Sequence, residues 1–150
     1  MNIPAKYRWI FVAITTGAIY LFLGVGLPNP SYPSDAQFRW RLAAWLMSGT
    51  VFLSHILYEE FALRNRSRTV AFHTSLAVAL GAFALAVAAN IHGWKVATPH
   101  QHLLVLSLII WPVLSAVPAW LVSFAGAAIM TRLRSKRQAP KVKDAPDQDA

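Results

Sequence analysis

The chain has 150 residues, of which 56% are hydrophobic and only 13% are charged. Charged residues usually make up about a quarter of a soluble domain, so this composition excludes an ordinary soluble protein and indicates a membrane protein. The net charge is +8, but the basic residues lie at the ends of apolar segments and form no stripe for nucleic acid. Cysteine is absent, which excludes disulfides, thiolate metal sites and a cysteine nucleophile.

The first apolar segment, residues 9–27, has the length of a membrane-spanning helix. The connection after it, residues 28–37, contains three prolines and predicts an exposed loop. The second apolar segment, residues 38–62, begins with arginines mixed with tryptophans. This mixture is typical of the headgroup zone, where the ring lies at the interface and the guanidinium extends to water. We therefore predict a second spanning helix here.

The third apolar segment, residues 69–92, is rich in alanine and predicts a third spanning helix. Its small residues Ala77, Gly81, Ala84 and Ala88 follow one another at helical steps, so they share a face on which another helix can approach closely. This face predicts helix packing, either within one bundle, which is the interpretation that we favour, or between two protomers.

The fourth apolar segment, residues 103–131, is longer than a bilayer requires, and Pro112 and Pro118 predict kinks in it. The basic C-terminal region ends in residues 138–150, which have no apolar periodicity and predict a disordered tail. Together the four segments predict one all-α domain, residues 1–137. This domain is expected to be an integral membrane four-helix bundle with up-down-up-down order, because short connections make successive helices antiparallel neighbours.

The positive charges predict the orientation of the chain. Eleven lysines and arginines lie in the N-terminus, in the connection after the second segment and in the C-terminal region, whereas the other two connections carry three. Because these residues accumulate on the cytoplasmic side, both termini are predicted to be cytoplasmic. The expected location is a bacterial inner membrane.

Two histidines on adjacent predicted helices are the main candidates for a cofactor-binding site. His55 precedes the middle of the basic turn by about ten residues and His73 follows it by about eight, so a rise of about 1.5 Å per residue puts both at similar depth. Facing histidines in a helical bundle predict a b-type haem site. The alternative is a structural hydrogen-bonded pair of His55 and Glu59, four residues apart, since buried polar groups are usually satisfied.

Metal binding is a further alternative at two places. The first set comprises His55 and His73, to which Glu59 would add a carboxylate ligand. The second set comprises His92, His100 and His102, around the third connection, where imidazoles would suit Zn or Cu. The competing interpretation of the second set is solvated surface.

The adjacent glutamates also have a simpler interpretation. Glu59 and Glu60 lie at the end of the second segment, and Arg64 and Arg66 lie in the turn that follows. The opposite charges predict ion pairs around this turn, which contribute little stability if they are exposed.

These observations favour a protein without catalytic activity of its own. The sequence shows no serine with base and acid partners, no Gly-rich phosphate loop and no carboxylate in the middle of a span. We predict an accessory or anchoring subunit of a larger membrane complex, whose partners are the lipid bilayer and other membrane subunits or a second copy. Two alternatives stay open: a redox protein holding one haem b between His55 and His73, and a small dimeric transporter.

Overall fold

The structure is a computed structural model, and it describes residues 7–26, 33–96 and 101–138. The chain in these ranges forms four α-helices and one π-helical turn, and it contains no strand. The elements are α1 (Arg8–Gly26), α2 (Ser34–Leu57), the π-turn η2 (Tyr58–Ala62), α3 (Ser67–Lys95) and α4 (Gln101–Gln138). The predicted all-α class is therefore confirmed.

Three of the described helices are long and apolar enough to cross a membrane, namely α1, α3 and most of α4. They fit a membrane protein. The remaining helix, α2, is long enough with 24 residues but does not reach the same apolar character. Its polar side chains, among them Arg41, Thr50 and His55, lower its hydropathy.

Two helices extend beyond their predicted bounds. The second helix begins at Ser34, inside the predicted loop. Pro33 can precede a helix because the backbone N–H that proline lacks has no partner at a helix start, and the negative charge of Asp35 in the first turn stabilises the helix dipole. The fourth helix continues through both of its prolines and ends at Gln138, beyond the apolar run. The rest of the predicted tail lies outside the described residues.

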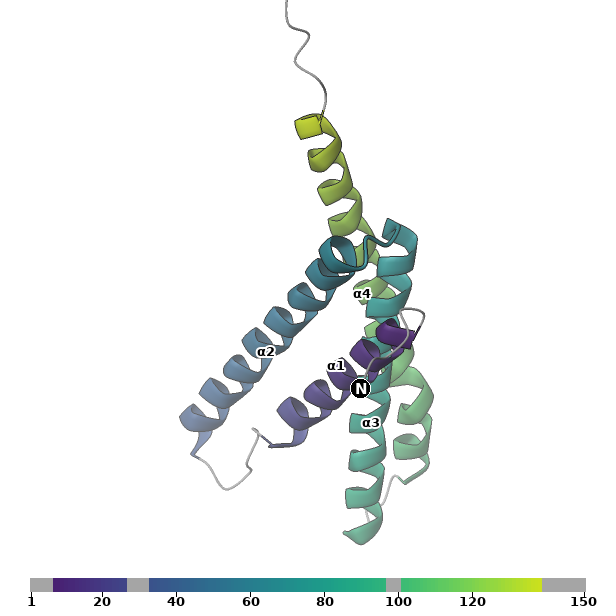
Figure 1. Ribbon diagram of the computed structural model, residues 1–150. Coiled ribbons are helices and arrows are strands. Elements are labelled where there is room, and N and C mark those ends of the chain that lie inside the picture. The colour runs from purple at the N-terminus through teal and green to yellow at the C-terminus, as the bar shows by residue number, and fades with distance from the viewer. Residues whose placement is uncertain (1–6, 27–32, 97–100, 139–150) are drawn as a thin grey trace, which may run out of the picture.

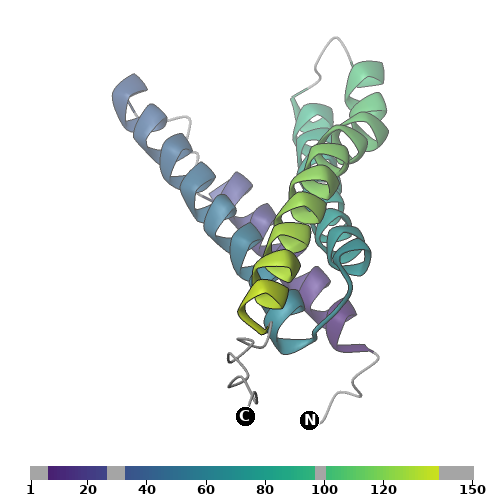
Figure 2. The ribbon, with the colours of Figure 1, turned by 90° about the horizontal axis from the view of Figure 1, so that it is seen from above.

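The helices form a V (Figure 2). One arm is the pair α3 and α4, which make the most extensive interhelical contact, and the other arm is α2. The arms meet where η2, the start of α3 and the C-terminal part of α4 come together, and α1 crosses α3 (Figure 1). A small apolar core of Ile56, Val70 and Ala127 lies at this vertex.

Glycines allow α1 to approach α3 closely. A Cβ atom added at Gly81 would lie 2.7 Å from the Cβ of Tyr20, and one added at Gly17 would lie 3.2 Å from the Cβ of Leu80. Real Cβ atoms do not approach to the first of these distances, so the crossing depends on Gly81 having no side chain.

The predicted small-residue face is divided in the structure. Ala77 and Gly81 are buried, and they lie beside α1 at the crossing just described. Ala84 and Ala88, further along α3, are only partly buried. Packing within the chain thus accounts for the first half of this face.

Candidate functional site

The vertex of the V holds a polar cluster formed by His55, Glu59, Asn65 and His73, here termed the junction cluster. His55 lies in the last turn of α2, Glu59 in η2, Asn65 in the following turn and His73 in the second turn of α3. The exposed fractions of Glu59, His55 and His73 are 0%, 3% and 9%. The structure therefore brings together the two histidines and the first glutamate that the sequence analysis singled out.

Glu59 is the centre of the junction cluster. Its Oε1 atom lies 3.1 Å from Nδ1 of His73 and 3.7 Å from Nε2 of His55. The side-chain amide of Asn65 donates a hydrogen bond to Oε2, and the Asn65 backbone N–H donates one to the Glu59 carbonyl at 3.2 Å. One carboxylate thus contacts α2, the turn and α3.

The π-turn explains how two consecutive glutamates become buried. A π-turn adds one residue to a helical turn and so changes which side chains face inward. The chain then leaves η2 through Arg64, whose φ of 50° lies in the left-handed region. Left-handed backbone is unfavourable for a residue with a Cβ, so the packing of the surrounding turn must stabilise it.

The first helix covers the junction cluster. The indole of Trp9 stacks on the imidazole of His73, with ring centroids 4.3 Å apart and ring planes 6° from parallel. This stacking fixes the orientation of the imidazole and shields the contact with Glu59. The contact of Trp9 could not be predicted, because nothing in the local sequence pattern connects residue 9 with residue 73.

His55 is the least satisfied member of the junction cluster. Both of its ring nitrogens are buried, and neither has a hydrogen-bond partner among the described residues. Its 3.7 Å separation from Glu59 is too long for a hydrogen bond. A small shift of either side chain would close this gap and form a hydrogen bond between the imidazole and the carboxylate.

Polar groups from three elements offset the burial of Glu59. The two imidazoles and the Asn65 amide face its carboxylate, and the residue is 0% exposed. A buried carboxylate needs such partners, because burial without them carries a large desolvation cost.

Glu60 makes a separate contact with α4. Its Oε1 atom lies 3.7 Å from the Arg134 guanidinium and accepts a hydrogen bond from the Thr131 hydroxyl at 3.4 Å. The predicted pairing of the glutamates with Arg64 and Arg66 is therefore replaced by contacts to imidazoles and to a distant arginine. The π-turn directs both carboxylates inward, where Glu59 faces the two imidazoles and Glu60 faces Arg134.

The predicted haem site can be compared with this geometry. An iron held by both histidines would lie directly between a nitrogen of His55 and a nitrogen of His73. The carboxylate of Glu59 takes up that position, since its Oε1 atom is the atom close to both rings. The residues as arranged do not fit a haem b.

The predicted metal ligands are distributed over opposite ends of α3. Glu59 lies beside His73, whereas His92 lies 19 positions further along α3, roughly 28 Å away at a helical rise of about 1.5 Å. His92 and His102 are exposed, and His100 lies outside the described residues. Over the described ranges, no three histidine or carboxylate side chains form a group that could hold a metal ion.

A second polar feature joins the two helices of the thicker arm. The Asn90 amide of α3 donates hydrogen bonds to the carbonyl of Ala86 at 2.8 Å and to the carbonyl of Leu104 in α4 at 2.7 Å. Asn90 is buried, and the second bond crosses between helices. Interhelical amide bonds of this kind stabilise membrane helix pairs.

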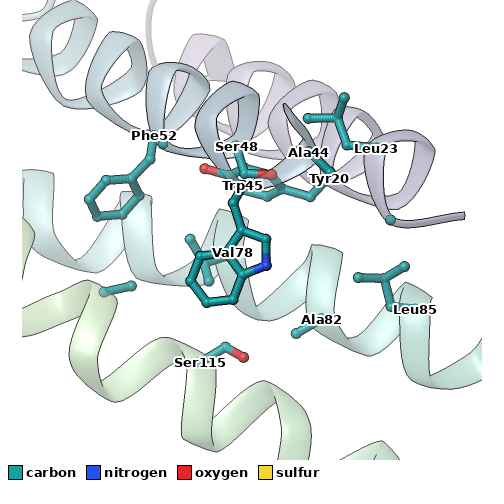
Figure 3. A pocket seen from close by; sticks show the side chains of 13 residues that line it. Tyr20, Leu23, Ala44, Trp45, Ser48, Phe52, Val78, Ala82, Leu85 and Ser115 are labelled. Carbon is teal, nitrogen blue, oxygen red and sulfur yellow. The ribbon is translucent and has the colours of Figure 1, made fainter. Parts of the chain in front are cut away.

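Between the arms lies a cavity of about 530 Å³, to which all four helices contribute (Figure 3). Its lining includes Tyr20 from α1, Trp45 and Ser48 from α2, Ala82 from α3 and Ser115 from α4. The tryptophans at the start of the second segment were predicted to lie in the headgroup zone. The cavity could not be predicted, because residues from four helices form its walls and the angle between the arms sets its width.

Comparison with known proteins does not assign the chain to a family. A scan against protein-family models, a search of curated proteins and a search of solved structures found no match. The class is therefore defined by the fold alone: an all-α protein with three helices that fit a membrane protein.

Proposed function

We propose that this protein is a non-catalytic accessory subunit of a larger complex in a bacterial inner membrane, and that the outer face of α2 binds a helix of a partner subunit. One observation carries the proposal. Of the 24 residues in α2, only His55 and Ile56, at its end, are buried by the rest of the described chain.

Two hydroxyls interrupt the otherwise apolar outer face of α2, on which Leu46 and Leu53 are exposed. Thr50 and Ser54 are exposed, and each hydroxyl donates to the backbone carbonyl four residues earlier in α2, at 2.9 and 2.8 Å. Such satisfied hydroxyls add polarity without needing water. Hydroxyl and small residues are enriched where membrane helices pack against one another, because they allow close approach.

The proposed topology has four spans with both termini in the cytoplasm. It rests on the distribution of positive charge, which also places the junction cluster near the cytoplasmic headgroups. A green fluorescent protein fused to the C-terminus is then expected to fluoresce, whereas alkaline phosphatase at the same position is expected to be inactive. The opposite pair of results would overturn the orientation.

The other two functions receive less support from the geometry. A haem would require Glu59 to leave its position between the imidazoles. Proton-coupled transport uses ionisable groups along the substrate path, and the cavity between the arms is lined by no Asp, Glu, Lys, Arg or His among the described residues. An accessory role requires neither feature.

The absence of cysteine in the chain allows a clean cross-linking test. Thr50→Cys places one thiol on the outer face of α2, and Val117→Cys places a matched control on the exposed surface of α4. In native membranes, a thiol-attached photo-crosslinker is expected to join the Thr50→Cys protein to one partner, which also co-purifies in stoichiometric amount with the tagged wild type. Equal adducts from both positions, or no adduct from Thr50→Cys, would contradict the proposal.

A further inference from the structure

The cavity between the arms is apolar and neutral, but it contains hydroxyl groups. Tyr20, Ser48 and Ser115 line it from α1, α2 and α4. The Tyr20 hydroxyl oxygen is buried without a hydrogen-bond partner, and neither serine hydroxyl bonds to another described residue. Thr50 and Ser54 on the outer face, in contrast, bond to their own helix. Unpaired hydroxyls in an apolar region favour a ligand that carries oxygen atoms.

Aromatic side chains give the cavity a second property. Trp45 extends from α2 into the space between the arms, in the direction of α3 and α4 (Figure 3). Tyr20 and Phe52 line the same cavity. Beside them, a Cβ atom added at Gly49 would meet nothing within 4 Å, so open space adjoins the indole. Aromatic side chains next to open space favour a flat ring that stacks on them.

We propose that this cavity binds a neutral, lipid-soluble molecule of the quinone class: a planar ring with two carbonyl oxygens and an apolar tail. The carbonyls would accept hydrogen bonds from the unpaired hydroxyls, and the ring would stack on Trp45. The volume of about 530 Å³ is sufficient for the ring and the first part of the tail. The remaining tail would leave between the arms into the bilayer.

The absence of charge from the lining separates this ligand from other membrane molecules. A phospholipid headgroup carries a phosphate, which requires basic or strongly donating partners. The described lining offers no basic residue, and its polar side-chain groups are three hydroxyls and the Trp45 indole N–H. An acyl chain alone would leave those hydroxyls unpaired. The inference concerns binding only and is independent of the partner subunit proposed above.

Photolabelling of the purified protein tests the inference. The wild type in nanodiscs is illuminated with an azido-benzoquinone that carries a ten-carbon tail, and labelled residues are located by mass spectrometry. We expect the label on cavity residues of α1, α2 and α3, with loss of labelling when excess unlabelled decyl-benzoquinone is present. Labelling spread over lipid-facing residues, without competition, would overturn the inference.

Two glycines supply a matched pair of variants. Gly49→Leu places a side chain in the open space of the cavity and is expected to reduce cavity labelling at least about tenfold, which equals about 1.4 kcal/mol of binding free energy. Gly126→Leu adds the same side chain in α4, where a Cβ also meets nothing within 4 Å and which lies outside the described lining. It is expected to label like the wild type. Equal labelling of the two variants would contradict the site.

The hydroxyls are tested separately. The double variant Ser48→Ala with Ser115→Ala is expected to weaken quinone binding roughly two- to tenfold for each lost hydrogen bond. Ser54→Ala, outside the cavity, is expected to leave binding unchanged. If a photoreactive fatty acid labels the same residues and displaces the quinone, the cavity is an acyl-chain site and the inference is wrong. All of these measurements use the isolated protein, so their failure is distinguishable from failure of the cross-linking test.

Discussion

The Nδ1 atom of His73 lies 3.1 Å from each carboxylate oxygen of Glu59. This contact joins the start of α3 to the π-turn that follows α2, so it lies where the two arms of the V meet. Trp9 stacks on the same imidazole and thereby brings α1 to the vertex. The angle between the arms, and with it the cavity, therefore depends on a small number of buried contacts.

Removal of the central carboxylate should weaken this vertex. Glu59→Ala is expected to lower the free energy of unfolding by about 3 kcal/mol, because the polar groups that faced the carboxylate remain buried without it. The measurement is reversible unfolding in detergent, followed by circular dichroism. Asp35→Asn breaks an exposed pair, in which Asp35 lies 3.8 Å from Arg39, and is expected to cost less than about 0.5 kcal/mol. Similar losses in the two variants would show that the junction cluster has no special role.

The crossing of α1 and α3 predicts intolerance of a single methyl group. Gly81→Ala would bring a Cβ to 2.7 Å from the Tyr20 Cβ, and the two helices must separate to relieve the overlap. We expect a loss of about 1–3 kcal/mol in thermal or denaturant unfolding. Gly126→Ala is the matched control, because its Cβ meets nothing within 4 Å and alanine favours a helix by up to about 1 kcal/mol. If Gly81→Ala is as stable as the control, the close approach is wrong.

The amide of Asn90 should contribute to the pairing of α3 with α4. Asn90→Leu removes the 2.7 Å hydrogen bond to the Leu104 carbonyl and is expected to destabilise the protein by about 1 kcal/mol. Ser135→Ala removes an exposed bond within α4, from the hydroxyl to the Arg132 carbonyl, and should have almost no effect. The measurement is the thermal stability of the two variants in the same detergent. Equal stability would show that the hydrogen bond between α3 and α4 does not contribute.

Part of the junction cluster could be predicted from the sequence. His55 and His73 lie at similar distances from the turn, and Glu59 is one helical step from His55, so their spacing alone groups these three residues. The central position of Glu59 could not be predicted, because it depends on the π-turn. Trp9 and Asn65 were missed, since a stacking contact and a turn amide leave no periodic pattern.

The sequence by itself determined that the chain is helical and that most of it suits a membrane, because helix hydrogen bonds join residues four apart and hydropathy is a sum over neighbouring residues. Only the tertiary structure decided that α2 leaves the other helices at an angle, that Glu60 contacts Thr131 across 71 positions, and that Trp45 lines a cavity. These relationships depend on how side chains pack between helices. Gly81 shows the reason: one absent methyl group sets a crossing, and no local pattern specifies which residue will lie opposite.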